Sequence, residues 1–279
     1  MAENSISYSQ FSMYMSCPIR WYNDYALNKR VFEQSIHTIF GTAMHEVLQN
    51  YLTVMYSTTA KKADEIDLAS DLQGRLVSLY QESAAKTGHF STPEELQSFY
   101  QDGVEILKYF KSKRRQHFSS HHELLGIETE LSVDIVKNLR FRGFVDVIIR
   151  DKRDGRITII DLKTSTRGWN KYQKKDHKKT AQLVLYKKFY AQQFNVNEDL
   201  IDVEYIILRR QINEDSEWPM KRIQTFAPAN GKPTVNKIGK LLSEFIDDAF
   251  NDDGTYNMDL NIDIPKCKDK WCKYCRKPK

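Results

Sequence analysis

Charged side chains interrupt two apolar stretches near the middle of the chain. Asp146 lies within GFVDVIIR, and Asp161 and Lys163 end the run ITIIDLKTS. Because the side chains of a β-strand alternate between its two faces, Asp161 and Lys163 share one face while Leu162 points to the other. A divalent cation with oxygen ligands, Mg²⁺ or Mn²⁺, would relieve the repulsion between two such carboxylates. Beside a lysine, that cation could polarise a phosphodiester and lower the pKa of an attacking water, which is nuclease chemistry.

The loop between the two stretches decides whether the two acids meet. A four-residue loop over KRDG places Asp146 opposite Asp161, whereas a two-residue loop of Asp154 and Gly155 places Asp146 opposite Lys163. Either even-length loop puts the three charged side chains on one face, and an odd-length loop or a bulge separates them. The alternative is a plain ion pair between Asp161 and Lys163, since the D-x-K tripeptide is common. Asp146 lies at the corresponding position of the preceding strand, and this second carboxylate favours a metal site over a plain ion pair.

The spacing of apolar residues changes from helical to strand-like near residue 122. Helical spacing predicts helices over 7–27, 36–56, 68–82 and 93–118. Alternation then predicts strands over 124–135, 139–150, 156–164 and 202–212, with helices over 180–194 and 233–250. This order predicts an α/β fold. We expect one structural domain that comprises a helical N-terminal part (1–121), a central core (122–212) and a C-terminal helix with a cysteine-rich tail (213–279).

Composition limits the class of protein. A chain of 279 residues that is 41% hydrophobic and 12% aromatic can bury one large core. No apolar run approaches the roughly 18 residues of a membrane helix, and the start MAENSISYSQ lacks the features of a signal peptide. We therefore expect a cytoplasmic, intracellular protein with no membrane partner. The net charge of +5 is compatible with a polyanionic partner but does not require one.

Four cysteines lie at opposite ends of the chain, at Cys17, Cys267, Cys272 and Cys275. Their distribution does not resemble the disulfide framework of a small secreted protein. Thiolates at C-x4-C-x2-C, with a distant fourth, can bind an iron–sulfur cluster or zinc. Free thiols are the alternative, which the crowding of three cysteines near the C-terminus disfavours. The pattern predicts a metal staple between the two ends of the chain.

The sequence GFVDVIIRDKRDGRITIIDLKTS resembles the catalytic hairpin of the PD-(D/E)XK nucleases, in particular the RecB-like branch with its AddAB-type nucleases and CRISPR-associated adaptation exonucleases. GTAMHEVLQ is similar to the upstream helical motif of that branch, with His45. TAQLVLY is similar to its Q-x-x-x-Y motif, with Gln182 and Tyr186, and the split cysteine cluster is also similar. The resemblance extends from about Ser7 to Cys275. It implies a restriction-endonuclease-like core, in which helices flank a mixed sheet.

The resemblance also implies roles for the candidate site residues. Asp146 and Asp161 are expected to bind the catalytic Mg²⁺ or Mn²⁺, helped by the backbone carbonyl of Leu162. Lys163 is expected to orient the attacking water or to stabilise charge that develops on the phosphoryl group. His45 would complete the metal shell, as a neutral imidazole can. The alternative for His45 is a core histidine with a satisfied hydrogen bond.

For the cysteines, the resemblance implies a 4Fe-4S cluster that joins the N-terminal helix to the C-terminal tail. The chain departs from the family here, because the family trio more often runs C-x2-C followed by a longer gap. In this chain Cys267 comes before the close pair Cys272 and Cys275. The same x4 then x2 spacing occurs in plant-type 2Fe-2S proteins. A 2Fe-2S cluster and zinc therefore remain open.

Further residues could support the site or contact DNA. Gln182 and Tyr186 share a helix face with Tyr190, where they could contact DNA or hold Lys163, although Tyr190 fits ordinary packing better. Glu128 and Glu130 share a strand face that could approach the metal or simply face solvent. The resemblance favours Glu128 of the two.

Basic and aromatic side chains alternate in the segment RGWNKYQKKDHKKT, residues 167–180. Trp169 and Tyr172 could stack on the bases of a single strand, while Lys174 and Lys175 pair with its phosphates. A solvated loop is the alternative. The position of the segment, between Lys163 and the Gln182 helix, favours DNA binding.

The sequence thus predicts a metal-dependent deoxyribonuclease that hydrolyses phosphodiester bonds. We expect an exonuclease on single-stranded DNA or DNA ends, with family precedent favouring 5′ to 3′ digestion, in DNA replication, recombination or repair. One alternative is a non-catalytic DNA-binding module with a structural iron–sulfur or zinc site. Another is a subunit that acts only with a helicase or recombination partner. The intact set of Asp146, Asp161 and Lys163 favours the enzyme.

Overall fold

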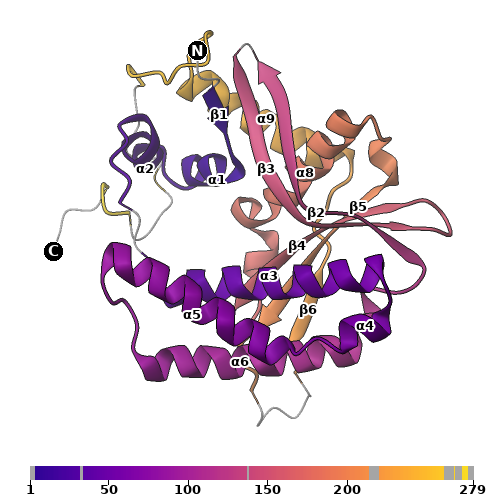
Figure 1. The fold of residues 1–279 in the computed structure, drawn as a ribbon. Helices are drawn as coiled ribbons and strands as arrows, with labels where there is room; N and C mark the ends of the chain where they lie inside the picture. Colours follow the sequence, from indigo (N-terminus) through magenta and orange to yellow (C-terminus); the bar gives the residue numbers. More distant parts are fainter. Residues whose placement is uncertain are drawn as a thin grey trace.

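A mixed β-sheet separates two layers of helices (Figure 1). The computed structural model describes residues 4–31, 34–136, 138–213, 220–260, 267 and 272–275. The described strands form one sheet of order β1-β3-β4-β5-β6, with β2 paired to the other side of β3. Their bounds are β1 (Asn4–Ile6), β2 (His122–Val136), β3 (Leu139–Asp151), β4 (Ile157–Ser165), β5 (Ile201–Arg209) and β6 (Ile223–Phe226). The α/β class is confirmed, and strands from all three parts of the sequence join this sheet.

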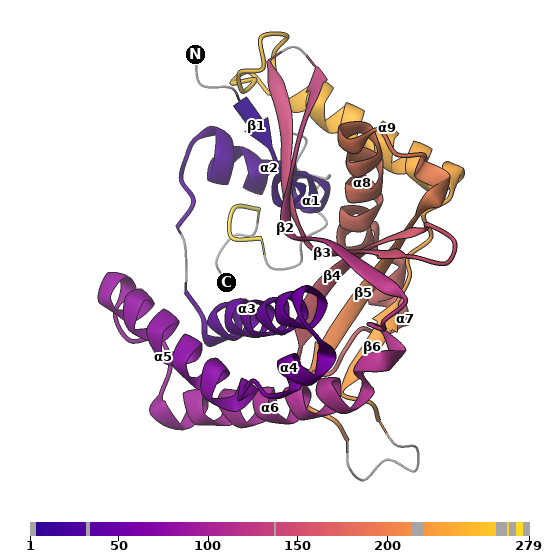
Figure 2. The ribbon, with the colours of Figure 1, turned by 45° about the vertical axis from the view of Figure 1, so that its right-hand side comes forward.

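The helices divide between the two faces of the sheet. One layer contains α3 (Ile36–Ser57), α4 (Ala60–Asp64), α5 (Leu68–Thr87) and α6 (Pro93–Lys113). The other contains α1 (Tyr8–Ser16), α2 (Pro18–Trp21), α8 (His177–Phe194) and α9 (Lys232–Ala249), and the short α7 (Lys171–Lys175) precedes α8. Figure 2 shows α8 and α9 on the opposite side of the central strands from α3, α5 and α6. Among the described helices, none has the length and apolar character needed to cross a bilayer.

Strand β4 is buried on both faces, which explains its nearly continuous apolar sequence. Ile157 and Ile159 pack into the core formed with α1, α8 and α9. Ile160 and Leu162 pack into the core formed with α3, α5 and α6. Asp161 and Lys163, near the C-terminal end of β4, therefore lie between the two helical layers.

The hairpin between β3 and β4 has the four-residue loop over residues 152–155. Its last ladder pairs join Arg150 to Ile157 at the loop and Val147 to Ile160 at the other end. Beyond Ile160, β4 continues beside β5 alone, while β3 continues with β2 and then β1. Of the two even-length loops that the sequence left open, the structure has the four-residue one, and β3 and β4 separate from each other at the level of the two aspartates.

Local sequence explains where several elements begin and end. The helix expected over 7–27 is interrupted, because Cys17 is extended and Pro18 starts a new helix. The Ser35 side chain caps α3 by accepting a hydrogen bond from the backbone N–H of Thr38. The sequence did not predict β1, α7 or β6, which span only three to five residues each.

Candidate active site

The fork between β3 and β4 brings the two predicted acids together. Asp146 Oδ2 accepts a hydrogen bond of 2.7 Å from the backbone N–H of Leu162, which is free because the β3–β4 ladder ends at Val147. Asp161 follows Ile160, the last residue of β4 that pairs with β3, and is almost completely buried. The fork thus exposes a backbone N–H of β4 to the side chain of Asp146.

Lys163 lies against Asp161. Its Nζ is 2.8 Å from Oδ2 and 3.1 Å from Oδ1 of Asp161. Burial lowers the pKa of Lys163, but the carboxylates of Asp161 and Asp146 outweigh burial, and the pKa lies above its ordinary value. The ammonium group is therefore charged, and it is the cation nearest to the two acids.

One lysine does not balance the two carboxylates. Burial raises the pKa of both Asp146 and Asp161 to about 6, although Lys163 opposes the shift. Asp161 Oδ2 is buried and accepts no well-aligned hydrogen bond within the described part of the chain, despite the nearby ammonium group. A buried carboxylate oxygen without a hydrogen bond is costly, and a bound cation would remove that cost.

His45 and Glu128 complete a group of possible metal ligands. His45 comes from α3, and its Nδ1 is 3.7 Å from Asp146 Oδ2. One ligand atom each of His45, Glu128 and Asp146 lie within 4.8 Å of one another. Burial lowers the pKa of His45, which favours the neutral imidazole that binds metals, and the backbone carbonyl of Leu162 hydrogen-bonds to the ring. The donor set of carboxylates and one imidazole suits Mg²⁺ or Mn²⁺.

Glu128 has an unusual backbone. Its φ is 47°, in the left-handed region that non-glycine residues rarely adopt. The residues on either side, Ile127 and Thr129, pair with Val147 and Val145, so Glu128 lies across from Asp146. Gln49 of α3 donates a hydrogen bond of 2.6 Å to Glu128 Oε1. A strained residue held by a neighbouring helix is typical of a functional site, although the sequence alone could not separate Glu128 from a solvated strand residue.

Gln182 and Tyr186 lie on α8 beside the acids. Gln182 Nε2 donates a hydrogen bond of 3.2 Å to the Tyr186 hydroxyl. Tyr186 is buried, and burial raises the pKa of its hydroxyl, with the Asp161 carboxylate acting in the same direction. The buried ring supports the floor of the site and is not available to stack on a base.

Gly143 provides the space for Tyr186. A Cβ at this position would lie 2.8 Å from Tyr186 Cε1 and 3.2 Å from Phe141 Cε1. We expect Gly143→Ala to lower the free energy of unfolding by about 1 to 3 kcal/mol, because the rings cannot move freely in the packed core. Urea denaturation monitored by tryptophan fluorescence measures this change. Gly74→Ala is the control, since nothing lies within 4 Å of the added Cβ, and equal stability of the two variants would contradict the packing role.

The structure corrects the prediction for Trp169. Its ring is buried in the core and packs against Tyr205, with ring centroids 4.8 Å apart. The Trp169 backbone N–H donates a hydrogen bond of 2.8 Å to Gln224 Oε1 of β6, and Gln224 Nε2 donates one of 3.1 Å back to the Trp169 carbonyl. Trp169 therefore anchors the segment to the sheet and does not stack on a DNA base.

The remaining predicted DNA contacts lie on α7. Tyr172 is 73% exposed, and Lys175 is also exposed. Lys174 is partly buried, with its ammonium group 5.3 Å from the centroid of the Phe226 ring. Tyr172 and Lys175 stay available to a ligand, and their contact with DNA stays a prediction.

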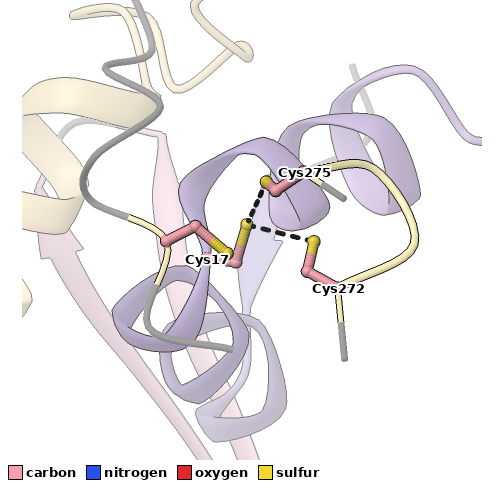
Figure 3. A group of neighbouring side chains, drawn as sticks. Cys17, Cys272 and Cys275 are labelled. Carbon is pink, nitrogen blue, oxygen red and sulfur yellow. Dashed lines mark hydrogen bonds between the residues drawn. The ribbon is translucent and has the colours of Figure 1, made fainter. Parts of the chain in front are cut away.

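The four cysteines meet although they are far apart in the sequence. Cys17 lies between α1 and α2, and Figure 3 shows its sulfur directed toward those of Cys272 and Cys275 in the C-terminal tail. Cys17 Sγ is 3.4 Å from each of these two sulfurs. The sulfurs of all four cysteines lie within 4.8 Å of one another. The two ends of the chain therefore form one potential thiolate site.

The distances between the cysteine sulfurs can be compared with those that each kind of metal centre requires. Four thiolates on one tetrahedral ion, with bonds of about 2.3 Å, have sulfurs roughly 3.8 Å apart. In a 4Fe-4S cluster each thiolate binds a different iron, so the sulfurs must lie farther apart by the width of the cluster. In a 2Fe-2S cluster the two pairs of sulfurs are separated in the same way. The four sulfurs, within 4.8 Å of one another, lie closer to the spacing around a single tetrahedral ion such as Zn²⁺, and the iron–sulfur cluster that the resemblance implies stays a prediction.

The model of the PD-(D/E)XK nuclease superfamily matches residues 5–277. A solved structure named "Putative exonuclease" from Eubacterium rectale is similar, with a TM-score of 0.48 and 12% identity, over 87% of this chain and 77% of that chain. No curated protein matches the chain.

Proposed function

The chain belongs to the PD-(D/E)XK nuclease superfamily, and from this we propose that it is a metal-dependent deoxyribonuclease that digests single-stranded DNA or DNA ends. The convergence of Asp146, Asp161 and Lys163 at the fork, with His45 and Glu128 beside them, carries the proposal. Mg²⁺ or Mn²⁺ in this site would supply polarisation of the phosphodiester and activation of water.

The residues of the fork have separate roles in this proposal. Asp146, Glu128 and His45, whose ligand atoms lie within 4.8 Å of one another, hold the metal together with Asp161. The Leu162 carbonyl, which hydrogen-bonds to the His45 ring, supports them from β4. The charged Lys163 ammonium group stabilises negative charge on the phosphoryl oxygens, because 33% of its side chain is exposed at the mouth of the site. Gln182, which is partly buried, donates a hydrogen bond to the hydroxyl of the buried Tyr186, and in this proposal the two side chains support the site from α8.

We further propose membership in the RecB-like branch, an exonuclease mode with 5′ to 3′ polarity, and a role in DNA replication, recombination or repair. The position of His45 on α3, the contact between Gln182 and Tyr186, and the joined cysteines support the branch. A structural metal centre at the cysteines, a 4Fe-4S cluster with a 2Fe-2S cluster or zinc as the alternatives, is the second proposed cofactor. A helicase or recombination partner belongs to the same proposal.

Digestion of labelled oligonucleotides tests the function. The full chain is incubated with single-stranded and duplex DNA, labelled at the 5′ or the 3′ end, in Mg²⁺, Mn²⁺ or EDTA. We expect cleavage of the single strand with either metal and none in EDTA. Immediate release of short 5′-labelled products, with gradual shortening of the 3′-labelled strand, is the expected pattern of 5′ to 3′ digestion. Binding without cleavage in every metal would favour the non-catalytic module.

Lys163→Ala is expected to retain DNA and metal binding but to lower turnover by about a hundredfold to a thousandfold. The ammonium group neutralises charge that is largest in the transition state, so its loss affects kcat more than KM. Single-turnover cleavage and DNA binding in Ca²⁺ separate the two effects. Lys62→Ala is the control, since Lys62 is exposed on α4 and pairs only with Glu65. Weaker DNA binding with unchanged turnover would instead make Lys163 a ground-state phosphate contact.

A further inference from the structure

A cavity of 1170 Å³ opens at the far end of α3 from the start of that helix. It is surrounded by the last turns of α3, the segment that follows α6, and the first residues of β2. The turn between β3 and β4 adds Lys152. The proposed catalytic residues do not line this cavity.

Hydroxyl groups and cations line the cavity. The hydroxyl side chains come from the end of α3 and from the segment before β2, and they include Thr53, Ser57, Thr58, Thr59, Ser119 and Ser120. The cations and histidines are Arg114, Arg115, Lys152, His121 and His122. Hydroxyls, guanidinium and ammonium groups are the side chains that bind phosphate oxygens in nucleic acids.

The charge of the lining is positive because its one acidic residue is already paired. Glu123 accepts a hydrogen bond of 2.6 Å from Arg150. Arg114 is likewise paired, with Asp64. Arg115 and Lys152 are exposed, and neither forms an ion pair with any residue in the described part of the chain. These two cations are therefore free to bind an anionic ligand.

One face of α3 connects the cavity to the metal site. His45, Gln49 and Thr53 follow each other at intervals of four residues, so they share this face. Thr53 lies about 12 Å beyond His45 at a rise of about 1.5 Å per residue. On β2, Leu124 of the cavity lies about 14 Å from Glu128 of the metal site, at about 3.4 Å per residue. The hydrogen bond from Gln49 to Glu128 joins the helix to the strand between the two places.

We propose that this cavity is a second DNA-binding site, which holds the phosphate backbone of the substrate strand roughly 12 to 14 Å from the metal site. The inference rests on the proposed function and deepens it. It assigns to the single-stranded DNA substrate a path along the surface between α3 and β2. The lining offers cationic and hydroxyl donors for phosphates, and phosphate contacts carry no sequence information, so we expect binding there to be independent of sequence. The site increases affinity for strands that are long enough to span both places.

The test compares two neutralised double variants of the full chain. Arg115→Gln with Lys152→Gln removes the two free cations of the cavity. Lys86→Gln with Lys240→Gln removes the same charge from α5 and α9, away from the cavity. Fluorescence anisotropy with a labelled 12-nucleotide oligothymidylate in EDTA measures the dissociation constant at several salt concentrations, and cleavage in Mg²⁺ measures kcat and KM.

We expect the cavity variant to bind the oligonucleotide about tenfold more weakly, with a salt slope smaller by about 1.4, as the loss of two single-strand phosphate contacts requires. Its KM rises while kcat is unchanged, and the control variant matches the original chain. Equal affinity and equal salt slope in both variants would refute DNA binding in the cavity, without affecting the proposed nuclease function. Failure of the original chain to bind or cleave single-stranded DNA would overturn both proposals. If the double variant unfolds, Lys152→Gln alone, in an exposed turn, gives the same comparison at about half the slope change.

Discussion

Asp161→Asn abolishes cleavage, with an expected loss of at least about a thousandfold in kcat, while the chain stays folded. Asparagine keeps the shape of the buried side chain but removes the negative charge on which the metal site depends. The fold survives because burial of this carboxylate is itself unfavourable, as its raised pKa of about 6 indicates. Gel analysis of end-labelled single-stranded DNA in Mg²⁺ and Mn²⁺ measures the activity, and circular dichroism measures the melting temperature.

Asp134→Asn is the matched control. Asp134 lies on β2 and forms an exposed ion pair of 2.8 Å with Arg140, which contributes little to stability. This variant should cleave DNA at the original rate. Asp146→Asn should resemble Asp161→Asn, because both acids belong to the fork. Substantial residual cleavage in Asp146→Asn and Asp161→Asn would refute the assignment of the metal site.

Cys17→Ser is expected to release the structural metal and to lower the melting temperature by about 10 °C, from a loss of about 3 kcal/mol or more. Cys17 is completely buried, and it is the N-terminal member of the thiolate site. Its loss leaves three thiolates from one short tail, which no longer tie α1 and α2 to the C-terminal residues. Elemental analysis of anaerobically purified protein and a thermal melt measure the two effects.

The same measurement decides the identity of the metal. One equivalent of zinc in colourless protein would indicate a single-ion site, as the sulfur separations suggest. Brown protein with about four irons would indicate the 4Fe-4S cluster that the resemblance implies. Ser16→Ala, one residue away, is the control and should retain both metal and stability. Protein without iron or zinc would remove the staple altogether, and Cys17→Ser would then melt like the original chain.

Sequence predicted the parts of the site that depend on local rules. Strand alternation and an even-length loop, both readable from the sequence, place Asp146, Asp161 and Lys163 on one face, but the choice between a four-residue and a two-residue loop needed the structure. The helix that carries His45 was predicted within one residue of its bounds, because its apolar spacing is regular. Approximate strand positions for β2, β3 and β4 follow from alternation in the same way.

The features that sequence missed depend on distant partners. Trp169 looked like a DNA contact because cations surround it, but Gln224 and Tyr205 hold it in the core. Gln224 lies on β6, a four-residue strand that gives almost no alternation signal. The left-handed backbone of Glu128 and the sulfur separations at Cys17 likewise depend on how remote segments pack. Local patterns carry no information about these contacts.

The union of the two chain ends has a consequence for folding during synthesis. Trp21 packs against Phe245 and Phe250, and Cys17 contacts Cys272 and Cys275. All of these partners are synthesised near the end of the chain. A ribosome that adds about 5 to 20 residues per second needs roughly 10 to 50 s to produce the later partners. During that interval α1 and α2 lack these C-terminal partners, although the catalytic fork is already made and so is α8, where the Lys178 carbonyl accepts a hydrogen bond from Ser12 of α1. If the four cysteines bind a metal, the metal-thiolate clamp would form last, after the catalytic fork is made, and would add the C-terminal contacts of α1 and α2 as a final step of folding.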